Sequence, residues 1–373
     1  MSINGKGVPF NDLSRIHLPL LNEFKSEFVR LVENSNLVLG TEVALFENEL
    51  AQAEGCKYAV GVNSGTTAIE LALRAFDIGP EDEVITTAFT FVATCFAILQ
   101  TGATPVLIDI DPLTGLMDPN GIERVITPKT KALVFVTLHG RVEGLDQIQK
   151  ICHLHNLHFI IDAAQSHLGT FNGKSQVDFC DASTLSFYPG KNLGALGEGG
   201  AVLTNSLEIR RRISLMRDWG AEEKYNHIEW GGNFRLEPLQ ASFLRIKLRE
   251  LKNWTEERQQ IAKTYQEKLN PDILMKDITE GGSHVYHIYS IQTPRREEIC
   301  IFLSSHLIGY GFHYPKAIHQ QPAYVSRVLT PVPLTNCECL ANTTLSIPIF
   351  PGQSPWEINR VIEAVNSAKQ SVG

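Results

Sequence analysis

Short apolar segments that alternate with helix-forming stretches constrain the fold of this chain more than any other feature. Between residues 58 and 162 these segments lack a regular apolar–polar alternation, so both of their faces are expected to be buried. Strands of this kind, separated by helices, are typical of a parallel sheet that helices cover on both sides. We therefore predict an α/β fold with strands at 58–62, 83–87, 105–109, 132–137 and 158–162.

The pattern changes in the C-terminal third. One long helical stretch with a charged side covers residues 236–261, and it is expected to link two domains. The segments beyond it indicate a smaller α+β domain, with strands at 285–291, 311–315 and 345–349 and helices at 296–307 and 356–372.

The length of 373 residues also favours two domains, because one hydrophobic core rarely grows that large. We predict an N-terminal arm over residues 1–20, a large domain over 21–240, and a linking helix with a small domain over 241–373. The formal net charge of −8 argues against a nucleic-acid binder that is held by bulk charge.

An uncharged stretch at residues 84–108 is long enough to raise the question of a membrane span. Gly102 and Pro105 interrupt it, so we interpret it as a buried strand, a helix and another strand. The N-terminus lacks the apolar core of an export signal. The 7 scattered cysteines are expected as free thiols, and no Cys or His cluster has paired metal-site spacing. We predict a cytoplasmic protein with no membrane span and no metal.

A small polar turn follows the first predicted strand. Asn63, Ser64, Gly65 and Thr66 lead from this strand into an Ala/Leu-rich helix. Free backbone N–H groups and the helix dipole point at one spot in such a turn, and glycine lets an anion approach closely. A phosphate site and a plain helix cap are the two interpretations.

A single lysine lies in the segment S-F-Y-P-G-K-N-L-G-A-L-G-E-G-G, between an apolar run and a glycine-rich loop. Burial lowers the pKa of a lysine and frees its amine as a nucleophile, so Lys191 is either a Schiff-base lysine or a solvated loop residue. Leu185 and Asn192 exclude a P-loop here, and no G-x-G-x-x-G follows a strand.

Four separated features together match what pyridoxal phosphate requires. A phosphate turn, an aromatic plate (Phe89 or Phe91), a carboxylate at a strand end (Asp162) and one lysine occur in that order along the chain. Donors hold the phosphate, an aromatic face covers the ring, a carboxylate keeps the pyridine nitrogen protonated, and an amine meets the aldehyde.

The segments N-S-G-T-T-A-I, I-D-A-A-Q-S-H, S-F-Y-P-G-K-N-L-G-A-L-G-E-G-G-A and G-N-F-R-L-E-P-L-Q-A resemble the DegT/DnrJ/StrS group of nucleotide-sugar aminotransferases. The resemblance covers nearly the whole chain. It implies pyridoxal phosphate as cofactor and the fold of the aspartate aminotransferases. In that fold a large domain holds a mostly parallel, seven-stranded sheet between helices, and a smaller α+β domain follows.

The resemblance also implies roles for individual residues. Lys191 would form the Schiff base and then move the substrate proton. Asp162 would hold the pyridine nitrogen, and Gln165 would lie by the ring hydroxyl. Asn233 would reach the cofactor phosphate of a neighbouring subunit, which implies a homodimer with shared sites. Four further residues would stack on the ring or hold the phosphate: Phe91, Gly65, Thr66 and Ser186.

Substrate contacts follow from the same resemblance. Lys224 and Tyr225 resemble a loop of members that aminate C3 of a dTDP-linked keto-deoxyhexose. Arg235 is a candidate for the donor carboxylate or the diphosphate. The segment that lines the sugar-nucleotide site would contain His313, Tyr314 and His319. The family's V-H-L-Y-G-Q reads V-T-L-H-G-R in this chain, so Thr137, His139 and Arg141 depart from the pattern.

We therefore expect transfer of an amino group from L-glutamate to a nucleotide-linked keto sugar, in deoxyamino sugar or polysaccharide biosynthesis. Amination at C2 or C4 of a UDP- or GDP-sugar is an alternative. A sugar dehydratase of this group carries histidine in place of the lysine, so Lys191 argues against it. A non-catalytic regulatory or binding protein on the same fold is the remaining alternative.

Overall fold

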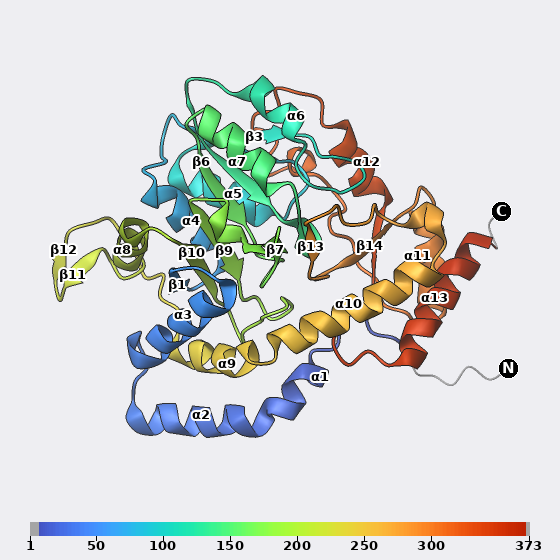
Figure 1. The fold of residues 1–373 in the computed structure, drawn as a ribbon, viewed down its shortest axis with the longest axis horizontal. Helices are drawn as coiled ribbons and strands as arrows, with labels where there is room; N and C mark the ends of the chain where they lie inside the picture. Colours follow the sequence, from blue (N-terminus) through green and yellow to red (C-terminus); the bar gives the residue numbers. More distant parts are fainter. Residues whose placement is uncertain (1–6, 371–373) are drawn as a thin grey trace.

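A seven-stranded sheet forms the centre of the large core in the computed structural model, which describes residues 7–370 (Figure 1). β10 runs antiparallel to both of its neighbours, and the other strands run parallel to one another. This sheet confirms the predicted α/β class. Its order is β1 (Tyr58–Val62), β10 (Gly200–Thr204), β9 (Ala182–Ser186), β6 (His158–Asp162), β4 (Thr130–Val136), β2 (Glu83–Thr87) and β3 (Thr104–Ile108).

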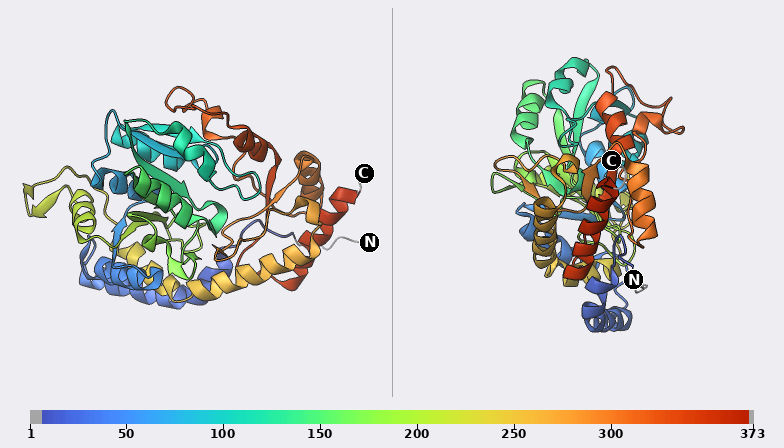
Figure 2. Two further views of the ribbon diagram at one scale, coloured as in Figure 1. Left: turned by 45° about the horizontal axis from the view of Figure 1, so that its top comes forward. Right: turned by 90° about the vertical axis from the view of Figure 1, so that its right-hand side faces the viewer.

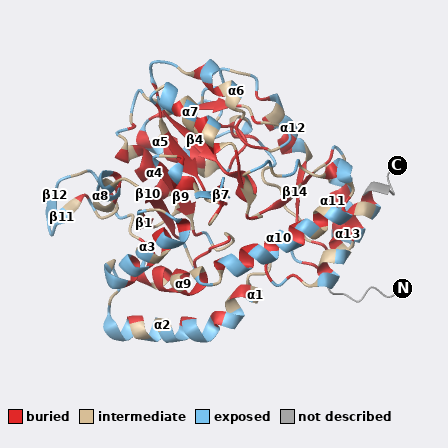
Figure 3. Ribbon diagram, in the orientation of Figure 1, coloured by how far each residue is buried: buried red, intermediate tan, exposed pale blue. Residues whose placement is uncertain are grey.

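Both faces of the sheet are buried, because neighbouring residues of one strand enter different clusters. In β4, Leu133 and Phe135 pack into one core cluster, while Ala132 and Val134 pack into the other. Figure 3 shows the strands as a continuous buried layer. Helices that contribute to the first cluster include α3 (Gly40–Glu54), α7 (Leu145–Leu154) and α9 (Pro238–Leu248). The second includes α4 (Gly65–Ala75) and α8 (Leu207–Met216), and α5 (Val92–Thr101) contributes to both.

The uncharged stretch at 84–108 folds as β2, α5 and β3, as predicted. Gly102 ends α5 with a φ of +91°, a conformation that suits glycine. Within residues 7–370, no helix combines the length and the apolar character that a membrane crossing requires.

A second hydrophobic core lies beyond the sheet. It contains Val8 from the N-terminal segment, Tyr265 and several aliphatic residues. Its elements are α10 (Leu251–Lys268), β14 (Tyr289–Gln292), α11 (Arg296–Ser305), β15 (Thr344–Ile347) and α13 (Pro355–Gln370). Which residues separate the two domains stays a prediction.

The single linking helix predicted over residues 236–261 is wrong. The chain forms α9 and α10, with a turn at Arg249 and Glu250. α9 packs beside α3, whereas α10 crosses to the second core (Figure 1). Both turn residues keep backbone angles near the helical region, so the hydrophobic period continues through the turn and conceals it.

Two predicted C-terminal strands also differ from the structure. Within residues 285–291 only the last three are strand, and they belong to β14. A short β13 (Ser283–His284), which pairs with β5 (Arg141–Val142), precedes them. Residues 311–315 form no strand, and only Gly311 bridges to Ser346. Both segments contribute residues to the wall of a cavity.

The predicted arm over residues 1–20 lies partly outside the described residues. Within them, α1 (Ser14–His17) and a 3-10 turn (Leu18–Leu20) lead into α2 (Leu21–Asn34). The remaining short elements are α6 (Pro119–Ile122), α12 (Thr335–Thr343), the pair β7 (Thr170–Phe171) and β8 (Lys174–Ser175), the pair β11 (Ala221–Glu223) and β12 (Asn226–His227), and 3-10 turns at Glu123–Val125, Leu138–Gly140, Gln176–Asp178, Pro271–Ile273 and Ile318–Gln320.

Candidate active site

A cavity of about 840 Å³ opens where the carboxyl ends of the parallel strands face the second core. Ligands bind at this edge in open α/β sheets. The cavity brings together nine of the residues singled out from the sequence: Gly65, Thr66, Phe91, Asp162, Gln165, Ser186, Lys191, His313 and Tyr314.

The N-terminus of α4 forms an anion cradle at one end of this cavity. Ser64 caps the helix by accepting the Thr67 N–H at 3.1 Å. The first N–H groups of a helix have no partner within the helix, so those of Gly65 and Thr66 are available to a phosphate. A Cβ atom on Gly65 would lie 2.5 Å from the Ser186 Cβ, so only glycine permits β9 to approach so closely.

The carboxylate of Asp162, 6% exposed, lies at the end of β6. Its Oδ2 accepts the Thr94 hydroxyl at 2.8 Å, and its Oδ1 accepts the Ala164 N–H at 3.2 Å. Burial raises the pKa of this carboxyl, against these hydrogen bonds and the nearby Lys191 charge. A protonated pyridine nitrogen would supply the positive charge that keeps a buried carboxylate ionised.

Lys191 begins the glycine-rich loop between β9 and β10. Its N–H donates to the Tyr188 carbonyl at 2.8 Å, which closes a tight turn around Gly190. A Cβ atom on Gly194 would lie 2.3 Å from the Pro189 oxygen, so the loop requires glycine there. Burial lowers the pKa of Lys191 to about 8, although the charge of Asp162 raises it. The lysine is therefore a partly buried amine in a cavity and not a solvated loop residue.

Aromatic side chains cover the cavity beside these groups. Phe91, which precedes α5, is 54% exposed and lines the cavity, whereas Phe89 is fully buried in the core. The ring of Phe91 lies 5.7 Å from that of Tyr314, centroid to centroid. Of the two candidates for the aromatic plate, Phe91 is the one with a face available to a ligand.

Two further substrate candidates and the cofactor candidate Asn233 do not line this cavity. Arg235 pairs with Asp218 at 2.7 Å, and His319 contacts Glu338 at 2.9 Å. Asn233 is exposed, and its carbonyl accepts from the side chain of Asn63. Their binding roles stay predictions.

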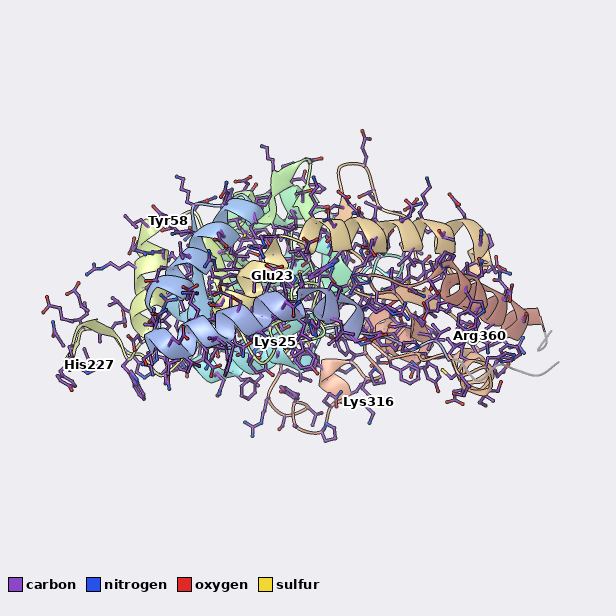
Figure 4. All side chains as sticks on the ribbon, turned by 90° about the horizontal axis from the view of Figure 1, so that it is seen from below. Glu23, Lys25, Tyr58, His227, Lys316 and Arg360 are labelled. Atoms are coloured by element: carbon purple, nitrogen blue, oxygen red, sulfur yellow. The ribbon has the colours of Figure 1, made fainter. Side chains whose placement is uncertain are left out.

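Lys224 and Tyr225 lie at the turn of the β11–β12 hairpin, which projects from the body of the molecule (Figures 1 and 2). His227, labelled in Figure 4, marks this projecting segment. Tyr225 is 83% exposed, and the Lys224 Nζ lies 5.2 Å from its ring centroid. Neither Lys224 nor Tyr225 lines the cavity of the same chain, so the binding role of both residues stays a prediction.

Sequence reasoning missed several cavity residues that come from distant segments. Phe10 and Asn11 of the N-terminal segment line the cavity together with His287 and Ile288. No local pattern distinguishes these residues. Thr94, in contrast, had a usable signal, because it lies one helical turn after Thr90 in an otherwise apolar segment and the two hydroxyls are 3.0 Å apart.

The three departures from the family pattern are all buried behind the cavity. Thr137 contacts the Ser166 hydroxyl at 2.6 Å. The Arg141 guanidinium pairs with Glu143 and donates to the carbonyls of Lys276 and Asp277, so it ties β5 to the segment before β13. These contacts hold the guanidinium of Arg141 away from the cavity, whose lining does not include it.

The donors and charges of the cavity fit pyridoxal phosphate. The cradle at Gly65 offers N–H groups to a phosphate, Asp162 offers a buried carboxylate to a cation, and Lys191 offers an amine with a lowered pKa. Within residues 7–370, no three His, Cys, Asp or Glu side chains gather as metal ligands.

Comparisons with known proteins agree with this geometry. The model of the DegT/DnrJ/EryC1/StrS aminotransferase family matches residues 20–366. The chain is 39% identical to the dTDP-3-amino-3,6-dideoxy-alpha-D-galactopyranose transaminase of Aneurinibacillus thermoaerophilus, over 96% of this chain and 99% of that one. It is 37% identical to a pleiotropic regulatory protein of Geobacillus stearothermophilus, over 96% and 97%. The crystal structure of S. venezuelae DesV in complex with a ketimine intermediate superposes with a TM-score of 0.94 at 36% identity, covering 97% and 98% of the two chains.

Proposed function

The chain belongs to the DegT/DnrJ/EryC1/StrS aminotransferase family, and we propose that it transfers the amino group of L-glutamate to the C3 ketone of a dTDP-linked 6-deoxyhexose. The family depends on pyridoxal phosphate. The observation that carries the proposal is one cavity that joins Lys191, Asp162 and the anion cradle of α4. The named transaminase from A. thermoaerophilus supports the choice of C3 and of dTDP.

Each residue of the cavity has a definite task in this reaction. When bound, pyridoxal phosphate supplies an aldehyde for the amine and a ring that stabilises negative charge on the substrate carbon. Asp162 holds a proton at the pyridine nitrogen, and Gly65 and Ser186 hold the phosphate. Lys191 Nζ accepts a proton from the substrate carbon and returns it, which its lowered pKa permits near neutral pH. Phe91 covers one face of the site and excludes water.

The test begins with the purified protein and pyridoxal phosphate. We expect visible absorbance from the lysine-bound cofactor, and we expect glutamate to bleach it. Lys191→Ala should bind the cofactor without this absorbance and should lose turnover. A panel of nucleotide-linked keto sugars then identifies the acceptor. Full activity of Lys191→Ala would contradict the role of the lysine. Preference for a C2 or C4 ketone of a UDP- or GDP-sugar would contradict the proposed acceptor.

A regulatory role without catalysis is the second candidate, because one similar relative bears a regulatory name. The joint presence of Lys191, Asp162 and Ser186 in one cavity supports an enzyme. The same bleaching experiment separates the two, since a non-catalytic binding protein keeps its absorbance when glutamate is added. We place the reaction in the cytoplasm, on the argument from the scattered cysteines.

The proposed working unit is a homodimer with shared sites. Phe91 and Tyr188 line the cavity yet are 54% and 56% exposed, so the cavity wall is incomplete in one protomer. Asn233 lies outside the cavity of its own chain, which supports a contact with a partner's cofactor. Mixing Lys191→Ala with Asn233→Ala should restore about a quarter of the activity, because each mixed dimer regains one intact site. An inactive mixture would argue against shared sites.

A further inference from the structure

One buried residue, His139, contacts three separate walls of the cavity without lining it. Its backbone N–H donates to Gln165 Oε1 at 2.5 Å. Its carbonyl accepts the Ile288 N–H at 3.3 Å, and its Nε2 lies 3.0 Å from the His313 carbonyl. The residue has a φ of +60°, a left-handed conformation that is uncommon outside glycine. This turn directs the backbone and the ring of His139 toward different walls.

The hydrogen bonds of the His139 ring determine its tautomer. A carbonyl oxygen can only accept, so Nε2 must carry the hydrogen that it donates to His313. Nδ1 is then the acceptor, and it lies 3.2 Å from the Ser290 hydroxyl. Burial lowers the pKa of His139 to about 3, with the charges of His313 and Lys191 acting in the same direction, so the ring stays neutral.

Two paired strands complete this arrangement. Ser290 of β14 and Ser346 of β15 are direct partners in the two-stranded sheet. Ser290 holds His139, and Ser346 lies 2.8 Å from Nδ1 of His313. The two histidines and the two serines therefore form a closed ring, in which the His313 carbonyl has one defined position.

The contact of His139 with Gln165 also fixes the side chain of Tyr314, the residue after His313. Because the N–H of His139 occupies Oε1 of Gln165, the amide must turn its Nε2 toward the Tyr314 hydroxyl, 3.0 Å away. The phenol oxygen accepts this bond, so the hydroxyl keeps its own hydrogen for another acceptor. Burial raises the pKa of Tyr314, which keeps the phenol protonated.

We propose that His139 is a positioning residue of the transamination site: it holds Gln165 and the His313 carbonyl so that the Tyr314 hydroxyl donates its hydrogen to an oxygen of the bound substrate. The acceptor is a carboxylate oxygen of the amino donor or an oxygen of the keto sugar. The inference rests on the proposed function for the identity of these substrates, but the position of the tyrosine is independent of them.

The test compares two amides that differ by one methylene group. His139→Gln places an N–H donor near the position of the histidine Nε2, whereas His139→Asn tolerates the left-handed backbone but is too short to reach the His313 carbonyl. Crystal structures with pyridoxal phosphate should show the Tyr314 oxygen in place in the Gln variant. In the Asn variant the backbone N–H of residue 139 still holds Gln165, but the His313 carbonyl loses its donor. The oxygen of the neighbouring Tyr314 should then lie beyond about 3.5 Å from Nε2 of Gln165.

Kinetics of the two half-reactions give the second measurement. His139→Asn should lower kcat/KM about 10-fold, as for the loss of one hydrogen bond, and His139→Gln should stay within about twofold of the wild type. In a Tyr314→Phe background the Asn change should have almost no further effect, because its action passes through the hydroxyl. A loss confined to the glutamate half-reaction assigns the acceptor as the donor carboxylate, and a loss confined to the ketone half-reaction assigns it as a sugar oxygen.

An unmoved tyrosine in the Asn variant, or an equal loss of activity in the Tyr314→Phe background, would overturn the positioning role. A wild-type protein that aminates no nucleotide-linked ketone refutes the proposed function instead. In that case the displacement of Tyr314 in the two crystal structures still decides the role of His139.

Discussion

The lowered pKa of Lys191 can be tested through the rate at which apoprotein takes up pyridoxal phosphate at different pH values. Burial brings this pKa to about 8. At about pH 7.5 roughly one amine in four is then neutral, compared with about one in a thousand for an ordinary lysine. Since the neutral amine is the nucleophile, the uptake rate should rise with pH and level off above a midpoint near 8.

The charge of Asp162 acts against burial by raising the pKa of Lys191, so Asp162→Asn should move the midpoint to lower pH. Visible absorbance of the reconstituted protein measures uptake, with Lys191→Ala as the control for other amines. A wild-type midpoint near 10, or one that Asp162→Asn leaves in place, would refute this reasoning.

Three further changes test the packing around the site. Gly65→Ala should weaken the affinity for pyridoxal phosphate at least about 10-fold and lower the free energy of unfolding by about 1–3 kcal/mol, because its Cβ would meet Ser186; a cofactor titration and urea unfolding measure the two effects. Arg141→Met should cost about 3–5 kcal/mol in urea unfolding, since it leaves the buried carboxylate of Glu143 unpaired, and a smaller loss when Glu143→Leu is added would support that cause. Burial raises the pKa of Glu54 to about 7, so the folded protein loses stability as pH rises from the ordinary pKa of this carboxyl to 7. Glu54→Gln should therefore raise the free energy of unfolding by about 3 kcal/mol at pH 8 and by nearly nothing at pH 4. Equal effects at both pH values would contradict the assignment.

Strands that are buried on both faces could be predicted to within two residues, and three of the five to the residue. The predicted bounds of β1, β2 and β6 agree with the structure, because their apolar runs end at polar turns. The turn that separates α9 from α10 could not be predicted, since Arg249 and Glu250 keep near-helical angles and the apolar period runs on. Its cause is tertiary, because α9 and α10 pack against different cores.

The candidate site was predictable where one residue type has few other uses. A lysine before a glycine-rich loop, an aspartate at a strand end and a glycine at a helix start each leave a local pattern, and Lys191, Asp162 and Gly65 do line one cavity. Phe10 and His287 reach the same cavity from segments more than 250 residues apart, and no local pattern indicates such a contact.

The sequence by itself determined the class of sheet, the approximate place of five of its strands along the chain, and the chemical types gathered at their carboxyl ends. Those properties follow from hydrophobic period and turn chemistry, which act over a few residues. Only the tertiary structure decided the burial that lowers the pKa of Lys191 and the positions of the hydrogen-bond partners of His139. Desolvation and hydrogen-bond direction depend on which distant segments surround a group, and that information exists only after the chain has folded.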